Sequence, residues 1–300
     1  MAARRRSAAR SAGAVGAVLT VGLAAVLGVL LLLWARDDGP RAAERCTARL
    51  DGTDWPLTTE QAENSALIVG STIRRGLPAR AATIGVATAL QESRLVNIDY
   101  GDRDSLGLFQ QRPSQGWGTP EQVMDPVYST NAFYDGLVEV EGWQDAEVTV
   151  AAQAVQRSAF PDAYAQHETR ARAWASSLTG HSPGSVTCDV PPADPQAPQA
   201  PHVTVADRVD RDLGLGGRAV RGDGATTRID ATALRYDDTT RSTWAVAHWA
   251  VATAEATGAV EVRADGRVWT RESAAWTALG PDENGPRDGV VRVRVVEPTA

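Results

Sequence analysis

The longest apolar run of the sequence constrains its organisation more than any other feature. Residues 11–35 carry no charged side chain, and the run closes with four consecutive leucines and Trp34. A helix of about 20 apolar residues is long enough to cross the ~30 Å hydrocarbon core of a bilayer. Residues 11–35 therefore predict one N-terminal transmembrane helix.

The charges on either side of this run predict its orientation. Four arginines precede it within the first ten residues, whereas Asp37 and Asp38 follow it. The positive-inside rule then makes residues 1–35 a cytoplasmic tip and membrane anchor, and places the rest of the chain outside the cell membrane. A cleaved signal peptide is the alternative. The run is longer than the usual apolar region of about 7 to 15 residues and no small-residue cleavage site follows it, which favours a single-pass anchor.

The charge balance argues against a nucleic-acid partner. The chain has 30 basic and 37 acidic residues, a net charge of −7, and four of its arginines precede the anchor. Proteins that bind nucleic acid carry the opposite excess, because they neutralise phosphates. The histidines show no ligand spacing, and two cysteines cannot complete a four-ligand zinc site. We therefore predict no metal and no other cofactor.

A proline-rich segment divides the part of the chain beyond the anchor. Residues 189–201 contain five prolines, a composition that favours extended polyproline II structure over a packed core. This linker separates residues 46–188 from residues 202–300, and residues 36–45 form a polar tether after the anchor. Two domains are expected, with the second free on its own tether.

Helical patterns predominate in residues 46–188. Thr58 followed by Gln61 is typical of a capping box. Ile84, Ala87 and Leu90 recur at helical spacing and mark one face of a second helix. The expected helices span residues 62–75, 79–95, 129–140, 147–157 and 164–178.

Residues 202–300 change from helical to strand periodicity and predict a small α+β domain of unknown role. A helix is expected at 244–256, a hairpin around the Asp265-Gly266 turn, and a last strand in which valines alternate with Arg292 and Arg294. These two arginines indicate a solvated sheet face and not a binding patch. Core packing is favoured over a stacking surface for four tryptophans, Trp244, Trp249, Trp269 and Trp276. A protein partner could bind through this domain.

One carboxylate has a position suited to catalysis. Glu92 lies near the C-terminal end of the helix predicted at 79–95, before a turn at Gly107 that is flanked by Leu108 and Phe109. The negative end of a helix and apolar surroundings both raise a carboxyl pKa, because they disfavour the ionised form. A carboxyl that is protonated near neutral pH can donate to the leaving oxygen of a glycosidic bond. A solvated surface glutamate is the alternative.

Two sequence motifs, one containing Glu92 and one shortly after it, resemble those of a known enzyme superfamily. Glu92-Ser93, together with Ser105-x-Gly107-x-x-Gln110, resembles the catalytic Glu-Ser and the Ser-x-Gly-Leu-Met-Gln motifs of the superfamily of soluble lytic transglycosylases and goose-type lysozymes. The resemblance covers residues 62–177 and is to a membrane-anchored member of actinobacterial type. It implies that residues 46–188 form a mainly α lysozyme-like domain. Together with the patterns described above, the expected fold class is this domain followed by the small α+β domain, with one N-terminal transmembrane helix.

The resemblance also implies an activity. The expected substrate is the MurNAc-GlcNAc bond of peptidoglycan glycan strands. Glu92 would donate a proton to the leaving oxygen and then take one from the C6 hydroxyl of the muramoyl residue, giving a 1,6-anhydro product. A hydrolase would instead need a second carboxylate. Asp99, Asp102 and Asp104 are the nearby candidates, in a loop that also reads as an ordinary polar turn.

The expected substrate-binding residues follow from the same motifs. Gln110 resembles the glutamine that lines the cleft, Ser105 belongs to its motif, and Ser93 is expected to position the glutamate, a local backbone bond being its alternative. Trp117 lies in a glycine-containing loop and would either stack on a sugar or pack into the core. The final candidate is Gln153.

Gln153 is chosen because the family's third motif, Ala-Tyr-Asn-Ala-Gly, is missing. The corresponding residues 151–155 have neither the tyrosine nor the glycine. Gln153, Gln156 and Tyr164 are candidates for replacement hydrogen bonds, with a helix surface as the alternative. The departure also leaves a second function open: a non-catalytic cell-wall-binding or assembly protein that retains a lysozyme-like cleft.

The two cysteines bracket the first domain. Cys46 lies soon after the anchor and Cys188 just before the proline-rich linker. Outside the cytoplasm, paired thiols are expected to oxidise. We therefore predict a Cys46–Cys188 disulfide that holds the two ends of the domain together.

Overall fold

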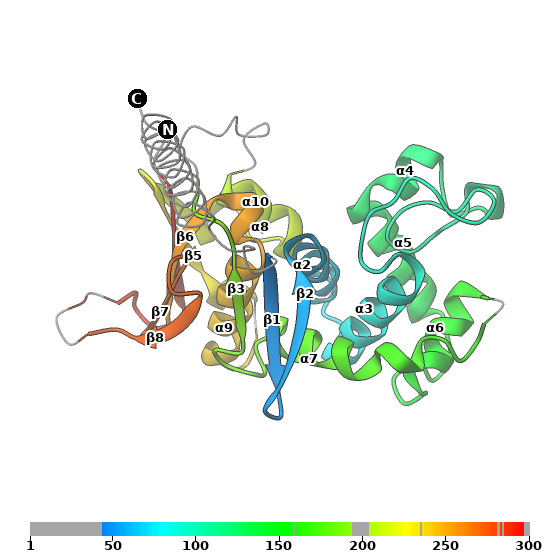
Figure 1. The fold of residues 1–300 in the computed structure, drawn as a ribbon, viewed down its shortest axis with the longest axis horizontal. Coiled ribbons are helices and arrows are strands. Elements are labelled where there is room, and N and C mark those ends of the chain that lie inside the picture. Colours follow the sequence, from blue (N-terminus) through cyan, green and yellow to red (C-terminus); the bar gives the residue numbers. More distant parts are fainter. Residues whose placement is uncertain are drawn as a thin grey trace, which may run out of the picture. The chain divides into compact units, whose positions relative to one another are not determined.

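The computed structural model describes residues 44–158, 160–193, 204–234, 236–280, 283 and 285–296 (Figure 1). The membrane anchor predicted at residues 11–35 lies outside these ranges. Among the described helices, none is both long and apolar enough to cross a bilayer.

The helices are α2 (Thr59–Arg74), α3 (Ala79–Ser93), α4 (Pro120–Met124), α5 (Pro126–Val138), α6 (Val148–Gln156), α7 (Glu168–Leu178), α8 (Val205–Leu213), α9 (Thr239–Ala252) and α10 (Ala254–Thr257). Short 3-10 turns are η1 (Pro113–Gln115), η2 (Ala165–His167), η3 (Gly217–Ala219) and η4 (Ala231–Leu234). The strands are β1 (Arg45–Leu50), β2 (Thr53–Thr58), β3 (Val186–Asp189), β4 (Val220–Asp223), β5 (Thr226–Asp230), β6 (Ala259–Ala264), β7 (Arg267–Thr270), β8 (Ala275–Ala278) and β9 (Val290–Val295).

The predicted mainly α fold is wrong, because two antiparallel sheets organise the described residues. One has three strands in the order β2-β1-β3, and the other has six in the order β4-β5-β9-β6-β7-β8. The first sheet occupies residues for which the sequence pattern predicts helix or loop. Its strands β1 and β2 are joined at Asp51 and Gly52, both with positive φ, and Cys46 and Ala48 point from β1 into the core. The fold is α+β throughout.

The predicted disulfide is present and closes the first sheet. Cys46 on β1 lies directly opposite Cys188 on β3, and the two sulfurs are bonded. Their Cα atoms are 3.9 Å apart, and the bond spans 142 positions of sequence. The ends of this part of the chain are therefore fixed side by side, as the sequence suggested.

Helix α3 is the centre of the helical part and carries the candidate site at its C-terminal end. α2 precedes it, and Thr58 and Gln61 form the predicted capping box at the start of α2. α3 packs against α2, α5, α6 and α7, so most of its side chains are buried. It ends where Arg94 takes the left-handed conformation.

The residues after the proline-rich linker do not hang free, in contrast to the expectation from the sequence. They belong to the same compact unit as the helical part, and α8 packs on α2 so closely that a Cβ at Gly70 would overlap the carbonyl oxygen of Asp212. His248 of α9 bridges α7 and the residue before β3, because its ring nitrogens bond the Ser177 carbonyl (2.7 Å) and the Ser185 amide (3.1 Å). Figure 1 shows the three-stranded sheet between helices α3, α5 and α6 on one side and strands β5 to β8 on the other.

The tryptophans of the C-terminal part contribute to this packing. Trp244, Trp249 and Trp269 are fully buried, which confirms core packing for them. The indole N–H of Trp269 donates to Thr187 (3.2 Å), and the half-buried Trp276 donates to the Val186 carbonyl (2.8 Å). Both acceptors belong to β3, so these indoles join the two sheets.

Candidate functional site

Glu92 stands one residue before the end of α3. The helix ends there because Arg94 and Leu95 have positive φ, and the Leu95 amide donates back to the Ala89 carbonyl (3.0 Å). Leu95 is buried beneath this turn, whereas Glu92 is half-buried. The Glu92 side chain is therefore neither fully buried in the core nor fully exposed to solvent.

Two side chains from distant parts of the chain hold the Glu92 carboxyl. The hydroxyl of Tyr164 donates to Glu92 Oε1 at 2.6 Å across 72 positions of sequence. The Gln156 side chain, at the end of α6, is a second hydrogen-bond donor to the carboxyl and also donates to the Phe109 carbonyl (2.7 Å). Tyr164 is fully buried, so its hydroxyl has a fixed position. The structure thus brings to Glu92 two of the three residues that were candidates to replace the missing motif.

The surroundings raise the pKa of Glu92 above its ordinary value. Burial is the largest cause, and the hydrogen bonds from Tyr164 and Gln156 oppose it in part. Burial also raises the pKa of the Tyr164 hydroxyl, and the neighbouring Glu92 carboxylate adds to this. Tyr164 therefore remains a protonated donor, while Glu92 keeps its proton to a higher pH than an exposed glutamate.

The Ser105 to Gln110 motif forms a tight turn against the end of α3. Ser93 ties the two together, because its hydroxyl donates to the Leu108 carbonyl at 2.7 Å. Gly107 has a φ of 76°, and a Cβ there would overlap the Val123 carbonyl oxygen. The Ser93 hydroxyl also has the Ala89 carbonyl within hydrogen-bond distance (3.2 Å), which is the local backbone bond of the alternative. Ser105 is buried at the base of the turn.

Gln110 supports the loop in front of the turn. Its side-chain amide donates to the carbonyls of Tyr100 and Gly107, both at 3.3 Å. A Cβ at Gly101 would overlap the Gln110 amide oxygen, so the loop passes directly over this side chain. In the structure, Gln110 therefore joins this loop to the turn at Gly107.

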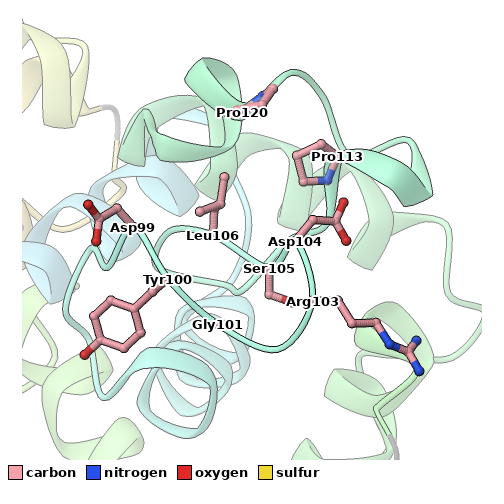
Figure 2. A pocket seen from close by; sticks show the side chains of 9 residues that line it. All are labelled: Asp99, Tyr100, Gly101, Arg103, Asp104, Ser105, Leu106, Pro113 and Pro120. Carbon is pink, nitrogen blue, oxygen red and sulfur yellow. The ribbon is translucent and has the colours of Figure 1, made fainter.

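A cavity of about 520 Å³ lies along the same loop (Figure 2). It is lined by Asp99, Tyr100, Gly101, Arg103, Asp104, Ser105, Leu106, Pro113 and Pro120. Figure 2 shows Asp99 and Tyr100 at one side of the loop and Arg103 and Asp104 at the other. Glu92 is not part of this wall, and Gln110 connects the loop to the turn that packs against α3.

Hydrogen bonds from two neighbouring residues hold the side chain of Asp104 in place. It accepts hydrogen bonds from the Ser114 amide (2.7 Å), the Arg112 Nε (2.9 Å) and the Ser114 hydroxyl (2.9 Å). These bonds hold the pKa of Asp104 well below its usual range, with the Ser114 amide as the largest cause. The side chain of Asp102 is 90 % exposed, and Asp99 is also exposed. Among the described residues, the hydrogen-bond partners of Glu92 are a phenol and an amide.

The remaining predicted residues lie around the site. Trp117 is half-buried and packs against the core, with its ring near Gly136 of α5. Gln153 donates to the Ser158 carbonyl at 2.8 Å, which holds the loop that leads to Tyr164. The structure thus gives Trp117 and Gln153 contacts that support the site from behind.

Other surface features near Glu92 had no signal in the sequence. Gln91, its neighbour, accepts hydrogen bonds from Gln166 and His167, both at 3.1 Å. Two aromatic side chains are exposed on adjoining loops: Tyr100 at 69 % and Phe160 at 73 %. Only the folded chain shows that the side chains of Gln166 and His167 lie beside Gln91.

Comparisons with models of known protein families and with curated proteins found no match for this chain. Within the described residues, no group of three or more histidine, cysteine, aspartate or glutamate side chains could hold a metal ion.

Proposed function

We propose that this protein cleaves peptidoglycan glycan strands at the MurNAc-GlcNAc bond, with Glu92 as the general acid and base. The observation that supports this proposal best is the environment of the Glu92 carboxyl. It is half-buried, its pKa is raised, and a buried tyrosine fixes its orientation. A carboxyl with a raised pKa and a fixed orientation is suited to protonate a leaving sugar oxygen.

The chemistry requires only this chain's own residues. Glu92 Oε1 accepts the hydrogen bond from Tyr164, so the acid carries its proton on Oε2. That proton passes to the glycosidic oxygen as its bond to C1 of the muramoyl residue breaks. The resulting carboxylate takes the proton of the C6 hydroxyl while O6 bonds to C1, which closes the 1,6-anhydro ring and restores the acid. The hydrogen bonds from Tyr164 and Gln156 stabilise the carboxylate between the two steps.

The surroundings of Glu92 suit a carbohydrate. Gln91 and Gln166 offer amide groups for sugar hydroxyls, and the exposed rings of Tyr100 and Phe160 offer apolar faces for pyranose rings. The partners that support Asp104 leave no activated second carboxylate there, so an anhydro product is favoured over hydrolysis.

The proposed setting is the outer side of the cell membrane, where the wall substrate lies. The Cys46–Cys188 disulfide supports it, because such bonds persist in oxidising compartments. The N-terminal anchor and its orientation belong to the same proposal and rest on the sequence pattern of residues 1–38.

The test is product analysis with purified protein and isolated peptidoglycan. Mass spectrometry of the soluble fraction should show anhydro-muropeptides for the wild type and none for Glu92→Gln. Asp102→Asn is the matched control, since it removes an exposed carboxylate from the neighbouring loop and should release the same products. Equal release by Glu92→Gln and wild type would refute the proposal. Glycan binding without release by either protein would instead favour the non-catalytic wall-binding function.

A further inference from the structure

The outer face of the six-stranded sheet carries a row of arginines. Arg221 on β4 is directly opposite Arg228 on β5, Arg228 is opposite Arg292 on β9, and Arg292 is opposite Arg263 on β6. Four neighbouring strands thus place the same cation at the same level. The strand pattern had indicated only a solvated face at Arg292.

Arginines directly opposite one another are unfavourable in a β-sheet. Side chains directly opposite each other lie about 5 Å apart at Cβ, and like charges at that spacing destabilise the pairing. The adjacent positions Val220, Ile229 and Val291 face the opposite side of the sheet, where Ile229 and Val291 are buried. The arginines are therefore not required by the core.

Carboxylates balance one end of the row. Arg263 pairs with Glu261 at 2.9 Å and with Glu283 at 3.6 Å. Toward the other end, the nearest ion pair of Arg228 is with Asp223 at 3.8 Å, and both of these side chains are more than half exposed. Arg228 therefore has a more distant carboxylate partner than Arg263 has, and the side chains of Arg221 and Arg228 are exposed to solvent.

A cavity of about 460 Å³ lies at that end. It is lined by Arg218, Ala219, Arg221, Arg228, Asp230, Pro286, Arg287, Val290 and Arg292. Five of these residues are arginines and one is an acid, Asp230, which is 3.6 Å from Arg287. This concentration of cations occurs in a chain whose net charge is −7. The charge excess is therefore local to this cavity.

We propose that this cavity binds an anion that bears two or more phosphate groups. Guanidinium groups bind phosphate oxygens through paired hydrogen bonds, and several of them around one hollow match several phosphates. A cavity of this volume exceeds the needs of a single small ion. A bound polyanion also relieves the like-charge repulsion along the row, so ligand binding and sheet stability are coupled.

Binding of tripolyphosphate to the full chain tests the proposal. Calorimetric titration of wild type should show saturable binding, and Arg221→Gln with Arg228→Gln should weaken it by about tenfold or more. The control removes two exposed arginines outside the cavity, Arg49→Gln with Arg172→Gln, and should change affinity by less than about twofold. Equal losses in both double variants, or none in the first, would overturn the proposal.

Further measurements distinguish phosphate ligands from other anions, and a loss of binding from a loss of folding. Phosphatidylglycerol vesicles identify a lipid source if they bind as tightly as tripolyphosphate, whereas equal binding of polygalacturonate would overturn the preference for phosphate. Without ligand, the Arg221→Gln, Arg228→Gln variant should unfold at or above the wild-type temperature, since like-charge repulsion is removed. Glu92→Gln should bind tripolyphosphate as wild type does, which keeps this site independent of the proposed glycan cleavage.

Discussion

Replacement of Asp212 by asparagine should severely destabilise the protein. Asp212 lies on α8, is fully buried, and accepts hydrogen bonds from Arg208 Nε (2.9 Å), Arg211 Nε (2.7 Å) and the Trp249 indole (2.9 Å). Arg208 in turn pairs with Glu63 on α2 at 2.5 Å. One carboxylate therefore connects α8 and α9, and through Arg208 it reaches α2.

The magnitude follows from the exposure of each partner. The side chain of Arg208 is 5 % exposed, and without the Asp212 charge only Glu63 would balance its own. Breaking a buried pair from one side costs about 3 to 5 kcal/mol. Arg211 is 36 % exposed, so water replaces much of what it loses. We therefore expect a loss of about 3 to 5 kcal/mol from a free energy of unfolding of about 5 to 15 kcal/mol.

The assay is urea-induced unfolding of the full chain, followed by tryptophan fluorescence. Asp210→Asn is the matched control, because Asp210 is an exposed aspartate on the same helix. It should change the free energy of unfolding by about 0.5 kcal/mol or less. If Asp212→Asn costs no more than Asp210→Asn, the buried network does not hold α8 in place and the reasoning is wrong.

Three further perturbations test other parts of the fold. Burial lowers the pKa of His248 from 6.5 to about 4, so the stability it contributes is present above pH 6.5 and is lost as the pH falls toward 4. Acid unfolding should show a loss of about 3 kcal/mol over that interval, which His248→Gln should remove. Cys46→Ser should lower the unfolding temperature, since a cross-link across 142 positions is worth up to about 5 kcal/mol, and reduction of the wild type should reproduce the change. Gly70→Ala should cost about 1 to 3 kcal/mol in chemical unfolding, because α8 must move away, whereas Gly222→Ala, where nothing lies within 4 Å, should be neutral.

Local signals in the sequence predicted much of the secondary structure. The helix expected at 147–157 is α6 at Val148–Gln156, and the Asp265-Gly266 turn joins β6 to β7. The same turn signal at Asp51-Gly52 joins β1 to β2, but its flanking strands are mixed in polarity. Pro56 further obscured β2, although an edge strand tolerates proline. These strands were missed because their pattern is too weak to outweigh the helical segments that follow.

Long-range relations were beyond the sequence pattern. Thr204 and Asp207 form a capping box at the start of α8, and Val205, Val209 and Leu213 mark one buried face. This signal could have identified α8, yet nothing local shows that α8 packs on α2. The prolines predicted an extended linker and, from it, a free second domain. Linker composition does not encode the apolar surfaces on either side, and these bring the two parts together.

The candidate site shows the same division. Position near a helix end identified Glu92 as the candidate. The motif predicted that Ser93 positions this glutamate, whereas in the structure its hydroxyl ties α3 to the following turn. The partners of the carboxyl were only candidates, because Tyr164 is 72 positions away and Gln156 lies on a separate helix. Residue types could suggest these hydrogen bonds, but only the packing of α6 and η2 near α3 selects them.

The most direct test of the central claim is the pH profile of glycan release, measured from about pH 4 to about 9 for wild type and Tyr164→Phe. If Glu92 is the acid, the wild-type rate falls as pH rises through the raised pKa of Glu92, with a midpoint above the ordinary glutamate value of 4.5. The hydrogen bond from Tyr164 lowers the pKa of Glu92. Its loss in Tyr164→Phe should therefore raise this pKa and move the midpoint to higher pH. A midpoint at the ordinary value, or one that does not move in Tyr164→Phe, would contradict the assignment of Glu92 as the catalytic acid.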